Sequence, residues 1–201
     1  MLSHRRIHAR LAVALAAAGI LAGGCGGSSS PFSGSFHAPP GYVAYHGNGY
    51  MLAIPAQFSA KAGTVSDQPP GSTVVEVTRG GTPAAKAQSE ILLLENPHLN
   101  FSLDQVVDNL SRADRTNTSV SNPEVSATKA TVPGARDARI VTESYVAPDS
   151  PSDPTPTRFD RKWLMVLVKP GLLLDVMVAN APKLGGHIDA DAVIDSFRLK
   201  Q

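Results

Sequence analysis

The sequence predicts an α+β fold in which helices pack on a mostly antiparallel sheet. Residues 163–168 and 172–179 are two apolar runs joined by Lys169-Pro170-Gly171, which predicts a long hairpin with a tight turn. One strongly amphipathic helix begins near Ser102, and a second helix follows Asp189 at the end of the chain. Together these elements predict one domain spanning residues 50–201.

The first part of this domain is predicted to contain three strands and a short helix. The strands are residues 50–54, 73–78 and 91–94, and the helix is residues 84–88. Pro55 ends the first strand because proline has no backbone donor. Thr82-Pro83 is typical of a helix start, with an N-cap followed by proline at the first helical position.

The clearest helix begins with a capping box. Ser102 and Gln105 stand at the spacing that lets each side chain satisfy a backbone donor of the other. The apolar stripe that follows consists of Leu103, Val106, Val107 and Leu110. Asp104 and Asp108 lie off this stripe, where Asp104 favours the positive helix start and Asp108 is solvated.

The second half of the domain alternates strands and turns. Residues 120–132 and 136–146 predict strands, the latter half-exposed, and residues 163–168 predict a central strand because both of their faces are apolar. Residues 148–157 contain four prolines, so we expect a loop that projects into solvent and stays out of the sheet. In the last helix, Asp189 is the expected N-cap and Ile188 packs on Val193. Its buried stripe is predicted to be Ala190, Val193, Ile194 and Phe197.

The amino-terminal segment predicts export. Arg5, Arg6 and Arg10 precede an apolar run at residues 11–21 that is well short of the roughly twenty residues of a membrane-spanning helix. Leu21-Ala22-Gly23-Gly24-Cys25 resembles the lipobox of bacterial lipoprotein precursors. We therefore expect residues 1–24 to be a lipoprotein signal peptide and Cys25 to be lipidated, anchoring the chain on the extracytoplasmic face of the cell membrane.

Residues 25–49 are rich in Gly, Ser and Pro and predict a flexible tether. Tyr42, Tyr45 and Tyr50 near its end have two interpretations. They could stack on a ligand, or they could pack the entry of the first strand onto the domain, which is the more common role. Without residues 1–24 the formal charge falls from +1 to −2, which argues against a nucleic-acid partner. Cys25 is the only cysteine, so no disulfide forms within one chain.

Three segments carry a family resemblance. Residues 49–55 (Gly-Tyr-Met-Leu-Ala-Ile-Pro), the hairpin at residues 163–179 and the terminal Ile-Asp-Ser-Phe-Arg-Leu at residues 194–199 resemble the PsbP-like sandwich of actinobacterial LpqN-type lipoproteins. The resemblance covers residues 50–201. It implies a surface or secreted protein without an established catalytic centre, and it assigns no functional residue.

No motif for catalysis or metal binding stands out, and we expect no cofactor. His37, His46, His98 and His187 lack the short spacing of zinc ligands. Ser126-Ala127-Thr128-Lys129 fits the S-x-x-K pattern of penicillin-recognising enzymes, but its companion motifs are missing and it falls in a predicted strand. Asp189, Asp191 and Asp195 lack the turn glycine and closing glutamate of a calcium loop.

The sequence thus favours a lipid-anchored, non-enzymatic binding domain of the bacterial envelope, whose partner is an envelope protein or a small apolar ligand. We expect its site to be an apolar groove between the sheet and the Ser102 helix, or near residues 148–157. Two alternatives stay open. One is an envelope hydrolase with a dispersed Ser/Asp/His site, and the other is a structural accessory subunit of an envelope complex.

Overall fold

The computed structural model describes residues 30–63, 70–79, 89–150, 153–180 and 187–200. These residues form a three-stranded sheet and a seven-stranded sheet. The small sheet has the order β1 (Tyr42–His46), β2 (Tyr50–Pro55), β10 (Arg198–Leu199). The large sheet has the order β3 (Phe58–Ala62), β4 (Thr73–Arg79), β5 (Glu90–Asn96), β9 (Leu172–Asn180), β8 (Asp153–Lys169), β7 (Asp137–Ser150), β6 (Ser121–Lys129). Neighbouring strands pair antiparallel, which confirms the predicted α+β class.

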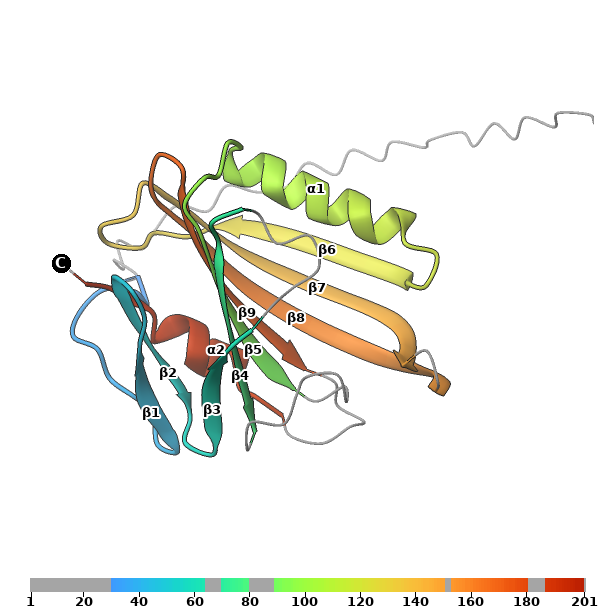
Figure 1. Ribbon diagram of the computed structural model, residues 1–201, viewed down its shortest axis with the longest axis horizontal. Helices are drawn as coiled ribbons and strands as arrows, with labels where there is room; N and C mark the ends of the chain where they lie inside the picture. Colours follow the sequence, from blue (N-terminus) through green and yellow to red (C-terminus); the bar gives the residue numbers. More distant parts are fainter. Residues whose placement is uncertain (1–29, 64–69, 80–88, 151–152, 181–186, 201) are drawn as a thin grey trace, which may run out of the picture.

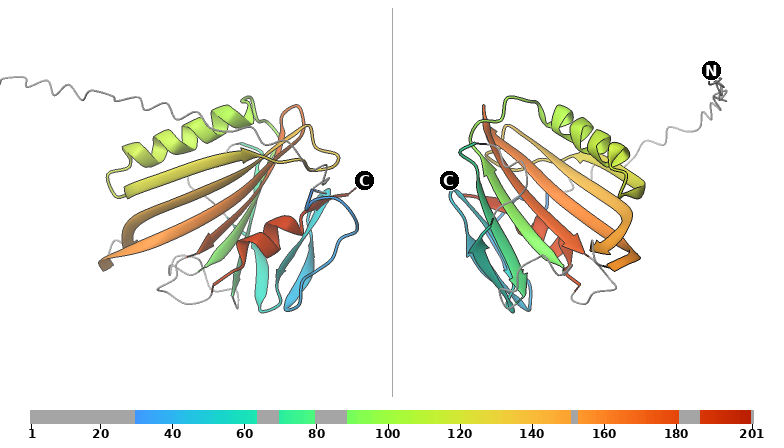
Figure 2. Two further views of the ribbon diagram at one scale, coloured as in Figure 1. Left: turned by 180° about the vertical axis from the view of Figure 1, so that it is seen from behind. Right: turned by 45° about the vertical axis from the view of Figure 1, so that its right-hand side comes forward.

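The large sheet separates two layers (Figures 1 and 2). Helix α1 (Leu103–Thr116) covers one face, and α2 (Ala190–Asp195) lies with the small sheet on the other. The alternation of β8 explains this, because Leu164 and Val166 enter the core beneath α2, whereas Trp163 and Met165 enter the core beneath α1. The prediction that residues 163–168 form a central strand covered on both sides is confirmed.

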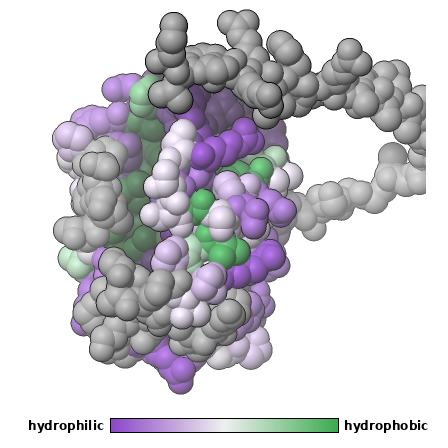
Figure 3. Space-filling view, turned by 90° about the vertical axis from the view of Figure 1, so that its right-hand side faces the viewer, coloured by the Kyte–Doolittle hydropathy of each residue, from purple (hydrophilic) through white to green (hydrophobic). Residues whose placement is uncertain are grey.

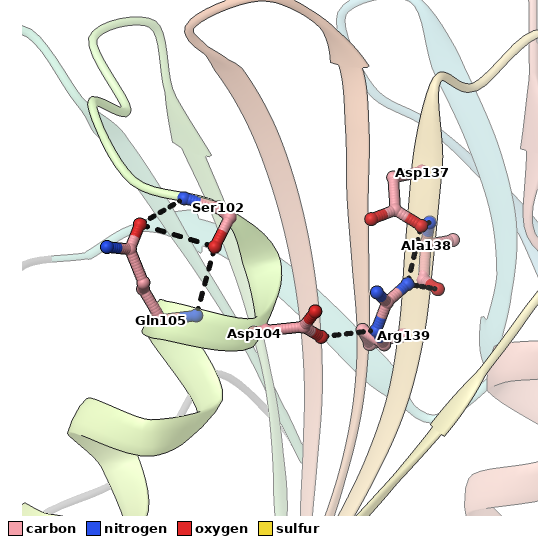
Figure 4. A network of polar contacts seen from close by, with 6 residues as sticks. All are labelled: Ser102, Asp104, Gln105, Asp137, Ala138 and Arg139. Carbon is pink, nitrogen blue, oxygen red and sulfur yellow. Dashed lines mark hydrogen bonds and ion pairs between the residues drawn. The ribbon is translucent and has the colours of Figure 1, made fainter.

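Helix α1 is fixed at its start by the predicted capping box. Ser102 Oγ accepts a hydrogen bond from Gln105 N at 3.2 Å, and Ser102 N donates to Gln105 Oε1 at 2.9 Å. Asp104 does more than favour the helix start, because its Oδ1 accepts a hydrogen bond from Arg139 Nε of β7 at 2.9 Å (Figure 4). This ion pair joins the first turn of α1 to the sheet.

The last helix follows its prediction except at Ala190 of the expected buried stripe, which is only partly buried. Asp189 caps it by accepting from Ala192 N at 3.0 Å, and Ile188, Val193, Ile194 and Phe197 are fully buried. Phe197 stacks on Tyr50 with ring centroids 5.6 Å apart. Tyr50, Tyr42 and Tyr45 all pack on this core, which favours the structural interpretation of the three tyrosines.

The prediction of a flexible tether through residue 49 is wrong for residues 30–49. β1 lies within it and pairs with β2, and the Phe32 side chain is only 2% exposed in the core beneath α2. The Gly, Ser and Pro content of the segment concealed these contacts because they form with distant residues. Ser30 Oγ, for example, donates to Thr131 O at 2.6 Å.

The prediction that residues 148–157 stay out of the sheet is also wrong. β7 and β8 remain paired as far as Ser150 and Asp153, and Pro148 stands opposite Pro156. β6 pairs with β7 only as far as Val146, and β9 pairs with β8 only from Asp160. Pro148, Pro154 and Pro156 therefore lie in a two-stranded extension, where each strand has a free edge and a missing donor is tolerated.

Several predictions lie outside the described residues, namely the signal peptide at residues 1–24, lipidation of Cys25 and the short helix at residues 84–88. Within the described ranges, the structure contains no helix long and apolar enough to cross a membrane. The strands β3 and β10 were not predicted, whereas the strands predicted at residues 50–54, 73–78, 91–94, 120–132 and 136–146 are present as β2, β4, β5, β6 and β7.

Candidate functional site

A cleft of about 650 Å³ opens on the face of the large sheet that carries α2. Its floor is formed by β6, β7, β8 and the end of β9, and the start of α2 borders it. The lining residues are Arg115, Pro123, Glu124, Val125, Ser126, Thr142, Glu143, Ser144, Arg158, Asp160, Arg161, Lys162, Val178, Asn180 and Ala190. None of them is aromatic, and most carry a hydroxyl, an amide or a charge.

Strand register brings the polar side chains of the cleft together. Ser126 stands opposite Thr142, and their hydroxyl oxygens are 2.7 Å apart. Thr142 stands opposite Lys162 in turn, so hydroxyl side chains from two strands share a row with the lysine side chain of a third. A row of hydrogen-bonding groups thus crosses three strands on one face of the sheet.

Two ion pairs lie in the cleft or at its border. Arg158 Nε is 3.0 Å from Asp160 Oδ1, and Lys162 Nζ pairs with Asp191 Oδ1 of α2. Arg158, Asp160 and Asp191 are well exposed to solvent, so these pairs contribute little to stability. Their charged groups can exchange partners for a ligand at low cost.

The border formed by α2 is held in place by Asn180, the last residue of β9. Its Nδ2 donates to Ile188 O and its Oδ1 accepts from Ile188 N, each at 2.9 Å and both buried. This pair of hydrogen bonds fixes the start of α2 against the sheet. Because the start of α2 is fixed in this way, Asp191 in its first turn is held opposite Lys162.

Two residues of the cleft lining, Glu143 and Arg161, also belong to a second polar cluster, because alternation along β7 and β8 directs their side chains toward α1. This cluster consists of Glu143 and Tyr145 from β7, Arg161 from β8 and Asp114 from α1. Burial, together with a hydrogen bond that the protonated Glu143 carboxyl donates to Asp114, raises the pKa of Glu143 to about 8 against the opposing effect of Arg161. Burial likewise raises the pKa of Tyr145 to about 12.

The predicted apolar grooves are only partly present. Beneath α1 the side chains are packed, with Leu103 1% and Trp163 6% exposed. Beside the β7–β8 extension lies a smaller recess of about 220 Å³, lined by residues that include Val120, Val146 and Pro148. Figure 3 shows the face at this end of the molecule, where hydrophobic residues appear between mainly hydrophilic ones. The cleft of about 650 Å³ is therefore polar, in contrast to the expected apolar groove.

The structure does not assemble the histidines into a site. His37 precedes β1, His46 ends it, His98 follows β5 and His187 precedes α2. In the part of the chain that the structure describes, no histidine ring makes a hydrogen bond, and no three His, Cys, Asp or Glu side chains are grouped to hold a metal ion.

The S-x-x-K residues are also separated. Ser126 and Lys129 both belong to β6, but three residues apart on a strand they point to opposite faces. Ser126 lines the cleft, whereas Lys129 stands opposite Arg139, which contacts α1. Asp108 is exposed on α1, as predicted.

The sequence did contain one signal for the cleft. Along β8, Arg158, Asp160 and Lys162 precede Leu164 and Val166 on the same face, so that face changes from polar to apolar within one strand. Such a change marks the point where the cover over a sheet ends. The faces of β6 and β7 change from polar to apolar at the same place, but this could be seen only once the strand order was known.

No protein-family model matches this chain, and no curated protein matches it at a significant level.

Proposed function

We propose that this chain is a lipid-anchored binding domain on the extracytoplasmic face of a bacterial membrane, with a fold of the PsbP-like type. The arginine-rich start, the short apolar run and Cys25 in its lipobox support the anchor. The antiparallel sheet with helices on both faces is consistent with the proposed type of fold.

The cleft on the α2 side of the large sheet is the observation that carries the binding function. Its volume of about 650 Å³ lies within the usual range for small-molecule sites, roughly 300–1,000 Å³. Hydroxyl, amide and charged groups line it, so we propose a polar ligand rather than the small apolar ligand that the sequence suggested.

Three forms of the full chain test this proposal in a bacterial host that processes lipoproteins. The wild-type chain should sediment with membranes and, after purification, release a small polar molecule that mass spectrometry identifies. Cys25→Ser should move to the soluble fraction and keep the ligand. Thr142→Trp should stay on the membrane and lose the ligand, because the indole fills the cleft.

Thr128→Trp is the matched control, since Thr128 is an exposed threonine in β6 that does not line the cleft. If Cys25→Ser stays with the membranes, the anchor is wrong. If Thr142→Trp and Thr128→Trp retain the same molecules as the wild type, the cleft is not the binding site.

A further inference from the structure

The apolar stripe of α1 ends on an acid. Leu103, Val107 and Leu110 pack on the core beneath the helix, and Asp114, four residues after Leu110, takes the next position on the same side. Its Oδ2 is buried, and no described donor reaches it. A position that burial would normally assign to an apolar residue therefore holds a carboxyl group.

Glu143 of β7 meets this acid from the sheet. Its side chain is 0% exposed, and Arg161 Nη1 lies 3.5 Å from Oε2, at the limit of a hydrogen bond. Oε1 is buried and receives no described donor, and the Asp114 carboxyl, whose Oδ2 is left without a partner in the same way, lies within hydrogen-bond reach of the Glu143 carboxyl. Ionised carboxylates only accept hydrogen bonds, so this contact requires a proton on one of the two.

We propose that one proton shared by Asp114 and Glu143 fastens the C-terminal half of α1 to the large sheet, and that loss of this proton at alkaline pH releases that half of the helix.

The charges around the pair cannot replace the proton. Arg161 supplies one positive charge. It stands opposite Glu143 of β7 on one side, and on the other side the small Ala179 of β9 separates it from Glu90 of β5. Its guanidinium is held over the Tyr145 ring, 4.7 Å from the centroid. If Asp114 and Glu143 were both ionised, three carboxylates would share this single cation. β6 contributes the uncharged Val125 to the same row.

The pKa of Glu143 is shifted in the direction that the proposed release of α1 requires. Glutamate in an unfolded chain loses its proton near pH 4.5, whereas burial raises the pKa of Glu143 to about 8. The folded protein therefore holds the proton at neutral pH. Its contribution to stability is complete below about pH 4.5 and is lost as the pH rises through about 8.

Release should be confined to one half of the helix. The first turn of α1 is held by the capping box and by the pair of Asp104 with Arg139, neither of which depends on this proton. The C-terminal half of α1, from Leu110 onward, is held to the sheet by Asp114 instead. The expected result of deprotonation is a helix attached at its start and open at its end.

Trp163 allows a direct test, because it is the only tryptophan and its ring centroid lies 5.9 Å from the Arg161 guanidinium. In the full chain, Trp163 emission should change with a midpoint near pH 8. Amide exchange over residues 110–116, corrected for its intrinsic pH dependence, should speed up at least tenfold across the same transition. Gln105 and Val106, whose amides donate to Ser102, should keep their protection.

Glu143→Gln and Asp114→Asn each replace the shared proton with a permanent amide donor, so both should abolish the transition and keep residues 110–116 protected at pH 9. Asp108→Asn is the matched control, since Asp108 is an exposed acid on the same helix, and it should keep the wild-type transition. The proposal is overturned if the two amide variants titrate like the wild type. If they fail to fold, carboxyl carbon NMR of the wild-type chain decides, because titration of Glu143 below pH 6 also overturns the proposal.

Discussion

Asp175 lies in the middle of β9, on the same face as Leu173 and Met177 of the core beneath α1. Its Oδ1 is buried and has no hydrogen-bond partner among the described residues. Burial alone raises its pKa to about 7. An acid in an apolar row thus stays protonated in the folded protein at mildly acidic pH.

This shift predicts a pH-dependent stability. An unfolded chain ionises Asp175 near pH 3.8 and the folded chain near 7, so the stability contributed by this proton is lost as the pH rises through that interval. Asp175→Asn cannot ionise. The difference in free energy of unfolding between this variant and the wild type should therefore shift in favour of the variant by about 1–3 kcal/mol from pH 5 to pH 8. Urea unfolding at both pH values measures this.

Asp160→Asn serves as the control, because Asp160 is exposed and its partner is the exposed Arg158. The difference in free energy of unfolding between Asp160→Asn and the wild type should change by less than about 0.5 kcal/mol between pH 5 and pH 8. An equal change in the Asp160 and Asp175 variants would contradict the assignment to Asp175.

At the scale of single elements, the start of α1 is the most local feature of the fold. Ser102→Ala removes one half of the capping box and should lower the free energy of unfolding by about 1 kcal/mol. Ser111→Ala, in the interior of the same helix, removes a hydroxyl without a capping role and should have the opposite or no effect, because alanine favours helices. Chemical denaturation of the two variants gives the comparison.

Elements that depend on neighbouring residues were predicted from the sequence, whereas elements that depend on residues distant in the chain were not. The capping box of α1 and the turn at Gly171, which has a φ of +84°, each depend on a few neighbouring residues. β1 has little apolar alternation and exists because β2 pairs with it. The prolines near residue 148 join a ladder only because β6 and β9 end before them.

The same distinction applies to the polar sites. The cleft combines residues from four strands and two helices, and the pair of Asp114 with Glu143 joins α1 to β7. A single strand shows its polar face in the sequence, as β8 does, but the partners across the sheet depend on strand order. The long hairpin was predicted, whereas the pairing of β9 with β5 was not.

At the scale of the whole molecule, both ends of the described chain enter one core. Phe32, from the segment predicted as a tether, is 2% exposed, so Phe32→Ala should cost about 3–5 kcal/mol of unfolding free energy. Phe101→Ala, at a phenylalanine that is 55% exposed, should cost less than about 0.5 kcal/mol. Thermal and urea unfolding of both variants would test this, and equal losses would mean that residues 30–41 are not part of the domain.

The small sheet unites the beginning and the end of the polypeptide. β10 pairs with β2, Phe197 stacks on Tyr50, and Arg198 Nε donates to Gly34 O at 3.2 Å. Residues 197–199 come at or after the end of every other described strand and helix in chain order, so this side of the interior cannot close before they are synthesised. Phe197, Arg198 and Leu199 therefore act as a latch that closes this side of the fold over residues synthesised much earlier.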